Sequence, residues 1–261
     1  MVDCSNFTNI SVAVSILFQV SRVIISFILE LASDILLPTN SVEAIRFFHV
    51  FISQMFFSLF YSYLFVEVAR WDNFILMQFI NLIFLIAQYP VRTTKLFHKV
   101  LTKIKYWVLY LLGIKKLLPK QFQKITSKTY ERHLQNIAAS FYLYEISTFT
   151  SIFAFLIYVN VLRSSDYNFQ MYPLLKDRYS ANSTYAISIT QQSMVLLVLE
   201  FVFIMVCNFM GFMVTGKNIS HMGRKLTIED DKTRFLYSLF MLHFLNDIHY
   251  FMQRAFSYSA Y

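Results

Sequence analysis

The sequence predicts an all-α fold, a polytopic transmembrane helical bundle, on the basis of three observations. First, 57% of the 261 residues are hydrophobic and only 15% are charged, whereas soluble domains carry about 25% charged residues. Second, the apolar residues form runs of about 18 to 27 residues, the length that crosses a bilayer core. Third, four Gly and four Pro offer few helix breaks. We therefore expect one membrane domain over residues 1–261, with five spans at 10–37, 44–69, 73–89, 136–162 and 190–215 and a candidate sixth at 235–252.

The first span, residues 10–37, carries a polar stripe, and Pro38 ends it. The polar residues recur at spacings of three and four, which places them on one face of an α-helix. Such a stripe predicts a face that turns away from lipid and toward other protein segments. The stripe consists of Ser15, Gln19, Arg22, Ser26, Glu30 and Ser33.

The second and third spans form a tight antiparallel hairpin. Only Arg70, Trp71 and Asp72 separate residues 44–69 from residues 73–89. Trp71 is typical of the side chains that lie at the boundary between membrane and water.

The segment between the third and fourth spans sets the topology. Residues 91–135 hold eleven Lys or Arg and one acidic residue, Glu131. Because Lys and Arg concentrate on the cytoplasmic side of membrane proteins, this basic loop is expected in the cytosol and the N-terminus on the outer or lumenal side. Alternating spans then return residues 216–234 to the cytosol, and that stretch is also basic.

Part of the basic loop predicts an interfacial, basic amphipathic helix. Lys95, Lys99 and Lys103 repeat every four residues, and the apolar run 106–112 is too short to cross a bilayer. Anionic lipid headgroups are the expected partner, although the same charges could serve only to orient the chain. The candidate headgroup-binding residues are Lys95, Lys99, Lys103, Lys105, Lys115 and Lys116.

Ionisable residues inside the spans predict a cluster of charges near the bilayer midplane. At about 1.5 Å per residue, Arg22 and Glu200 lie about 18 and 15 Å from the outer ends of their helices. An ionisable side chain at this depth costs about 2.5 to 3.5 kcal/mol, so it should face the protein interior and have a partner. The candidate cluster consists of Arg22, Glu145, Glu200, His243 and Asp247.

Three interpretations of this cluster remain open. It could line a path or site for an ion, a proton or a polar headgroup. It could instead be a structural ion pair that holds helices together. Some of the carboxylates could also face a partner protein in the membrane.

Several functional classes lack support in the sequence. Cys4 and Cys207 cannot build a disulfide framework or a cysteine metal site. His243 and Asp247 are four residues apart, without the further ligands that a metal site needs, so we expect no metal and no cofactor. Nucleophile elbows, zinc-protease motifs and phosphate loops are absent, which argues against an enzyme. A basic segment tethered at a membrane with no recognition module argues against nucleic acid as a partner.

Asn182 is a candidate glycosylation acceptor.

The leading functional hypothesis is a transport- or channel-type protein, or a pore-lining subunit, that uses the midplane charges. One alternative is a non-catalytic subunit that assembles with other membrane proteins. Another is a lipid-handling membrane enzyme with its site near Asp34, His49 and the basic loop. The expected location is an endomembrane, such as the endoplasmic reticulum, or the plasma membrane.

Overall fold

The fold is known from a computed structural model of the 261-residue chain, which describes residues 4–36, 71–111, 113, 127–163, 184–228, 234, 238 and 239. In these ranges the chain is helical and contains no strand, which confirms the predicted all-α class for this part of the protein. The helices are α1 (Cys4–Leu36), α3 (Trp71–Gln88), η1 (Val91–Thr93), α4 (Lys95–Leu111), α5 (Ser127–Arg163), α8 (Thr184–Thr215) and α9 (Ile219–Ile228).

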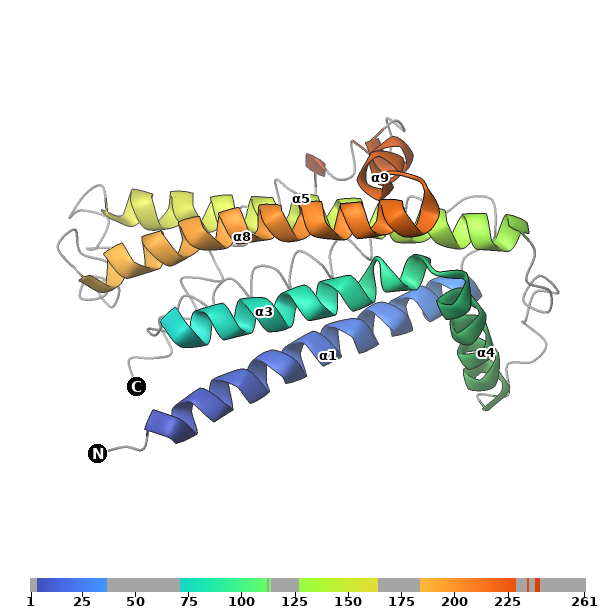
Figure 1. The fold of residues 1–261 in the computed structure, drawn as a ribbon, viewed down its shortest axis with the longest axis horizontal. Coiled ribbons are helices and arrows are strands. Elements are labelled where there is room, and N and C mark those ends of the chain that lie inside the picture. The colour runs from blue at the N-terminus through green and yellow to red at the C-terminus, as the bar shows by residue number, and fades with distance from the viewer. Residues whose placement is uncertain are drawn as a thin grey trace.

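Four long helices lie along a common direction, with α1 beside α3 and α5 beside α8 (Figure 1). Contacts between side chains give their relative directions. Gln19 of α1 bonds Asn81 of α3, and Arg22 bonds Tyr89 further along both helices, so α1 and α3 run in parallel. Tyr144 of α5 bonds Glu200 of α8, whereas Ile152 and Leu156, further along α5, pack with Leu196, which is earlier in α8. The two helices therefore run in opposite directions.

Three of these helices contain stretches that are long and apolar enough to cross a membrane: Trp71–Thr93, Tyr130–Ile157 and Thr190–Thr215. A shorter apolar stretch in α1 covers Val12–Ile28. Their outward faces expose large apolar side chains, which suits contact with lipid rather than water. The described helices are therefore compatible with membrane insertion. The predicted span 44–69 and nearly all of the candidate span 235–252 lie outside the described residues.

The basic loop predicted at 91–135 contains much regular structure. It includes η1, α4 and the beginning of α5, which starts at Ser127 rather than at residue 136. The apolar run that predicted the span marks where a bilayer would begin, whereas the helix itself continues through polar residues of good helix propensity. The second basic stretch, 216–234, likewise holds α9.

Short polar contacts turn the chain at the end of the long helices where α4 and α9 lie (Figure 1). After Pro90, the Thr93 hydroxyl donates to the Pro90 carbonyl at 2.6 Å, and Thr94 Oγ1 caps α4 by accepting from Phe97 N at 3.2 Å. After α8, Gly216 adopts a positive φ of 69°, a conformation that L side chains rarely take. These two turns direct α4 away from the end of α3 and direct α9 back against the side of α5.

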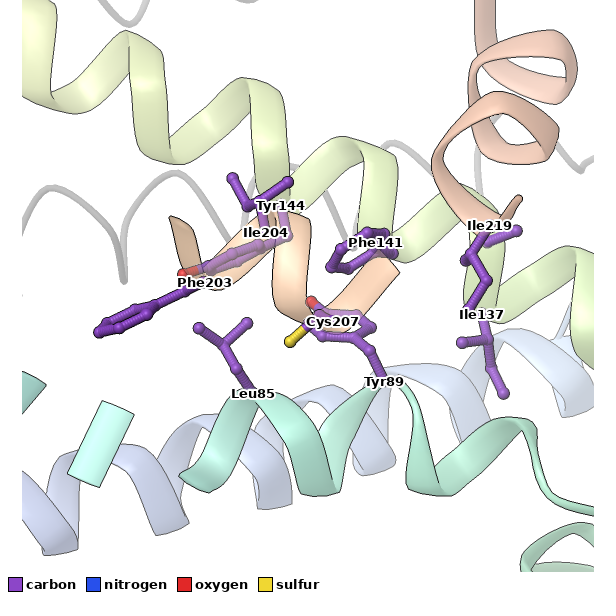
Figure 2. Close-up of a cluster of buried hydrophobic side chains, with 10 residues drawn as sticks. Leu85, Tyr89, Ile137, Phe141, Tyr144, Phe203, Ile204, Cys207 and Ile219 are labelled. Carbon is purple, nitrogen blue, oxygen red and sulfur yellow. The ribbon is translucent and has the colours of Figure 1, made fainter. Parts of the chain in front are cut away.

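Two apolar clusters form the interior. The Tyr89 cluster lies toward the end that bears α4 and α9, and Figure 2 shows its side chains meeting between α3, α5 and α8. The Phe74 cluster lies toward the opposite end of the same helices. The Tyr89 cluster consists of Leu85, Tyr89, Ile137, Ala138, Phe141, Tyr144, Phe203, Ile204, Cys207 and Ile219. The Phe74 cluster consists of Phe74, Met77, Ile152, Leu156 and Leu196.

Candidate functional site: a buried polar layer

Glu200 of α8 is the centre of a hydrogen-bond network that joins four helices. Its Oε1 accepts from the Asn81 side-chain amide at 2.7 Å, and its Oε2 accepts from the Tyr144 hydroxyl at 2.8 Å. The Asn81 carbonyl oxygen in turn accepts from Gln19 Nε2 at 3.0 Å. Glu200 is only 2% exposed. The network therefore links α1, α3, α5 and α8 through groups that have been removed from solvent.

Arg22 places a positive charge beside this network. Its guanidinium carbon lies 4.8 Å from the centre of the Tyr144 ring, a cation–π geometry. Its side chain also bonds the Tyr89 hydroxyl and donates to Gln19 Oε1 at 3.5 Å. Arg22 and Glu200 thus contact opposite parts of Tyr144, and their charges attract each other across it.

The polar groups form a layer between the two apolar clusters. Along one face of α3, successive turns carry Met77, Asn81 and Leu85, which are apolar, polar and apolar in that order. One face of α8 repeats this order with Leu196, Glu200 and Ile204. Because residues four apart share a helix face, both helices present the same three tiers. Along α3 and α8 the layer therefore lies between the Phe74 cluster on one side and the Tyr89 cluster on the other.

Two further polar side chains are buried on the side of the layer toward the Phe74 cluster. Ser15 precedes Gln19 by about one turn of α1, and Gln78 precedes Asn81 by about one turn of α3. Since α1 and α3 run in parallel, these residues lie at similar levels. Both are buried, and neither the Ser15 hydroxyl nor the Gln78 amide has a hydrogen-bond partner within the described residues. A buried polar group without a partner costs about 1 to 3 kcal/mol.

Glu145 does not join Glu200 in this layer. It follows Tyr144 in the chain and is therefore turned about 100° around α5. Its Oε2 accepts from the Ser220 hydroxyl of α9 at 2.8 Å, whereas its buried Oε1 has no partner in the part of the chain that is described. Ser220 N donates to Asn208 Oδ1 at 3.4 Å, which ties α9 to α8 as well. Glu145 thus serves the contact between α5 and α9.

The remaining predicted site residues fall into two groups. Lys95, Lys99 and Lys103 are exposed on α4, whereas Lys105 is only 6% exposed and faces the protein body. The other group lies outside the described side chains and consists of Asp34, His49, Lys115, Lys116, Asn182, His243 and Asp247. Among the residues that are described, no three His, Cys, Asp or Glu gather in a way that could hold a metal ion.

A pair of stacked histidines joins α4 to α5. The rings of His98 and His133 lie 4.4 Å apart between centroids. His133 Nε2 lies 3.0 Å from the Arg92 carbonyl, and the Tyr130 hydroxyl donates to the Thr93 carbonyl at 2.6 Å. Burial lowers the pKa of His98, and the nearby Lys105 lowers it further. This pair is therefore suited to hold α4 against the bundle while His98 is neutral.

Sequence reasoning missed three members of the network: Asn81, Tyr89 and Tyr144. The available signal was weak but present, because Gln78, Asn81 and Gln88 interrupt the apolar run of α3 at spacings that keep them near one face. Tyr89 and Tyr144 gave no such signal, since tyrosine is also common at membrane boundaries.

Comparison with known proteins identifies a family without naming an activity. A family model described as SPCC553.12c matches residues 8–253, nearly the whole chain. No curated protein and no solved structure matches the chain.

Proposed function

We propose that this chain, which belongs to the SPCC553.12c family, is a transport- or channel-type membrane protein that passes a small cation or proton through the polar layer around Glu200. The observation that carries this proposal is the position of that layer between the Tyr89 and Phe74 clusters. A buried carboxylate with apolar side chains above and below it along two helices resembles an ion site of the kind that transporters commonly place near the bilayer midplane.

The chemistry of the layer suits a cation or proton. Glu200 supplies the negative charge, while Asn81 and Tyr144 place an amide and a hydroxyl against its two oxygens. Arg22 offsets that charge in the resting arrangement. A cation that takes the place of these contacts would be held by oxygen ligands, which hard cations prefer. The unpartnered Ser15 and Gln78 extend the layer toward the Phe74 cluster and would serve as the next polar contacts.

The distribution of positive charge supports a specific orientation. Both basic helices, α4 and α9, lie at one end of the long helices (Figure 1). Following the preference of Lys and Arg for the cytoplasmic side, we assign this end to the cytosol and the N-terminal end of α1 to the outer or lumenal side. The membrane would be an endomembrane or the plasma membrane.

The test is ion flux in reconstituted vesicles. The purified chain is placed in liposomes, and proton and potassium movement are followed with a pH-sensitive dye and a potassium-sensitive dye under an imposed gradient. Glu200→Gln, which keeps the side-chain shape, should lower the flux by about tenfold or more, because the ion would lose the negative charge that Glu200 supplies. Glu131→Gln is the matched control, since Glu131 is 62% exposed and pairs with Lys217 at the surface. Absence of flux for both probes in the unmodified protein would refute the proposal.

A second function, that of a non-catalytic structural subunit, is favoured by one observation. Both oxygens of Glu200 already accept hydrogen bonds, so the network satisfies its central charge without any guest. In that case the pair formed by Arg22 and Glu200 would hold the four helices in register for assembly with other membrane proteins. The double variant Arg22→Met with Glu200→Leu separates the two functions. Loss of flux with the fold and any stoichiometric partner retained supports the ion path, whereas loss of the fold or of the partner supports the structural role.

A further inference from the structure

Helix α4 presents three distinct faces. One face of the helix is buried against the bundle and includes His98, Leu101 and Lys105. A second face carries the exposed lysines and two exposed tyrosines. The third face is continuous and apolar, points away from the protein and consists of Leu96, Val100, Ile104, Trp107 and Leu111.

The exposed apolar face is too large for a helix surrounded by water on that side. Leu96 is 74% exposed, Trp107 is 63% exposed and Leu111 is 76% exposed. These residues recur at intervals of three and four, so their side chains form one stripe. A contiguous exposed apolar stripe in a folded protein marks a surface that something apolar covers.

The position of α4 indicates what covers the stripe. Figure 1 shows α4 turned steeply away from the direction of α1 and α3 at the end of the bundle, so that it would lie along a membrane surface if those helices cross the bilayer. The exposed lysines border the apolar stripe on one side: Lys95, Lys99 and Lys103 follow one another at every fourth residue. This arrangement of an apolar stripe edged by positive charge fits the boundary between acyl chains and phosphate groups.

We propose that α4 is an interfacial helix that binds anionic phospholipid headgroups through Lys95, Lys99 and Lys103 while its apolar stripe enters the lipid. Lys105 has no part in this surface, because it is buried against the bundle. The stacked pair of His98 and His133 fixes the rotation of α4 so that the lysines and the stripe face outward. This binding surface is separate from the polar layer and does not depend on ion flux.

Tryptophan fluorescence tests the proposal in the full-length protein. The chain contains two tryptophans, so Trp71→Phe leaves Trp107 as the reporter on the α4 stripe. This variant is reconstituted in mixtures of phosphatidylcholine and phosphatidylglycerol in which one or the other lipid carries brominated chains, which quench a tryptophan in contact with them. The ratio of quenching gives the relative binding constant of the two lipids beside Trp107.

Phosphatidylglycerol should be favoured by about tenfold or more at low salt, since each lysine near an anionic surface contributes about fivefold. Replacement of Lys95, Lys99 and Lys103 by Gln should bring the ratio close to unity. The matched control replaces Lys217, Arg224 and Lys225 by Gln, which removes the same amount of positive charge from the same end of the bundle. In this control the preference for phosphatidylglycerol should stay high. High salt provides a test without mutation: the preference should vanish at about 1 M, where the Debye length is about 3 Å, while quenching itself persists.

Three outcomes would overturn the proposal. Lack of quenching by either brominated lipid would show that the stripe does not enter the bilayer. Equal quenching by both lipids at low salt would show that the lysines do not select anionic headgroups. An equal loss of preference in the control variant would assign the effect to net charge rather than to α4.

Discussion

The network around Glu200 predicts that one hydroxyl strengthens the contact between α5 and α8. Tyr144→Phe removes the hydroxyl that donates to Glu200 Oε2 at 2.8 Å and leaves the aromatic ring beneath Arg22 in place. The same hydroxyl also shares a hydrogen bond with the Thr148 side chain one turn along α5. The change therefore removes the polar contacts of this hydroxyl and leaves the cation–π contact and the packing of the Tyr89 cluster in place.

The expected loss follows from the charge and burial of the acceptor. Hydrogen bonds to charged groups contribute about 1.5 to 3 kcal/mol, whereas bonds between membrane helices average about 0.6 kcal/mol with a maximum near 1.7. Tyr144 and Glu200 are each only 2% exposed, so water cannot replace the lost donor. We therefore expect Tyr144→Phe to lower the free energy of unfolding by about 1.5 kcal/mol, where the two ranges overlap.

The assay is equilibrium unfolding of the purified protein in mixed micelles with increasing denaturing detergent. Tyr142→Phe is the matched control, because Tyr142 lies on the same helix, is half-buried and makes no hydrogen bond through its hydroxyl within the described residues. Its unfolding free energy should change by less than about 0.5 kcal/mol.

A double-mutant cycle with Glu200→Leu, which removes the acceptor altogether, decides whether the hydroxyl acts through Glu200. If it does, the coupling energy between the two substitutions should be about 1 kcal/mol or more, because each removes the same bond. An unchanged stability in Tyr144→Phe, or a coupling energy near zero, would refute the role assigned to this hydrogen bond.

Three further predictions concern the end of the bundle that bears α4 and α9. Gly223→Ala would place a Cβ against the carbonyl group of Ala138 and push α9 away from α5. This overpacking should lower the free energy of unfolding by about 1 to 3 kcal/mol, which is measured as a fall in the thermal unfolding temperature. Burial lowers the pKa of His98, so its contribution to α4 docking is complete above the ordinary value of 6.5 and is lost as the pH falls through the lowered value. Proteolysis of α4 should thus increase in acid, and His98→Asn should flatten that dependence. Lys217→Ala should change stability by less than about 0.5 kcal/mol in the same unfolding assay, because its 3.3 Å ion pair is solvent-exposed.

The helices were predictable to the extent that lipid imposes a pattern on sequence. Runs of apolar residues indicated α3, α5 and α8, since about 20 such residues are needed to cross a bilayer. Helix α9 had no such signal: it is ten residues long, mixes Arg224 and Lys225 with apolar side chains, and depends on packing against α5. A short helix of this kind gains most of its stability from tertiary contacts, which a single sequence does not display.

The rotation of the candidate site residues around their helices could not be predicted from the sequence. Counting residues along a helix gives the level of a charge, because each residue advances the axis by about 1.5 Å. It does not give the direction in which the side chain points relative to other helices. Glu145 and Tyr144 show the difference, since these neighbours lie at almost the same depth but contact α9 and Glu200 respectively.

The buried groups that have no partner bear on the choice between an ion path and a structural contact. Holding four helices in register requires Gln19, Asn81, Tyr144 and Glu200, and these already satisfy one another. Within the described residues Gln78 makes no hydrogen bond to that network, and a buried amide without a partner costs about 1 to 3 kcal/mol. An apolar side chain at that position would serve a structural bundle better. A polar side chain there agrees with the proposed passage of an ion or proton through the layer, in which it would be a further polar contact.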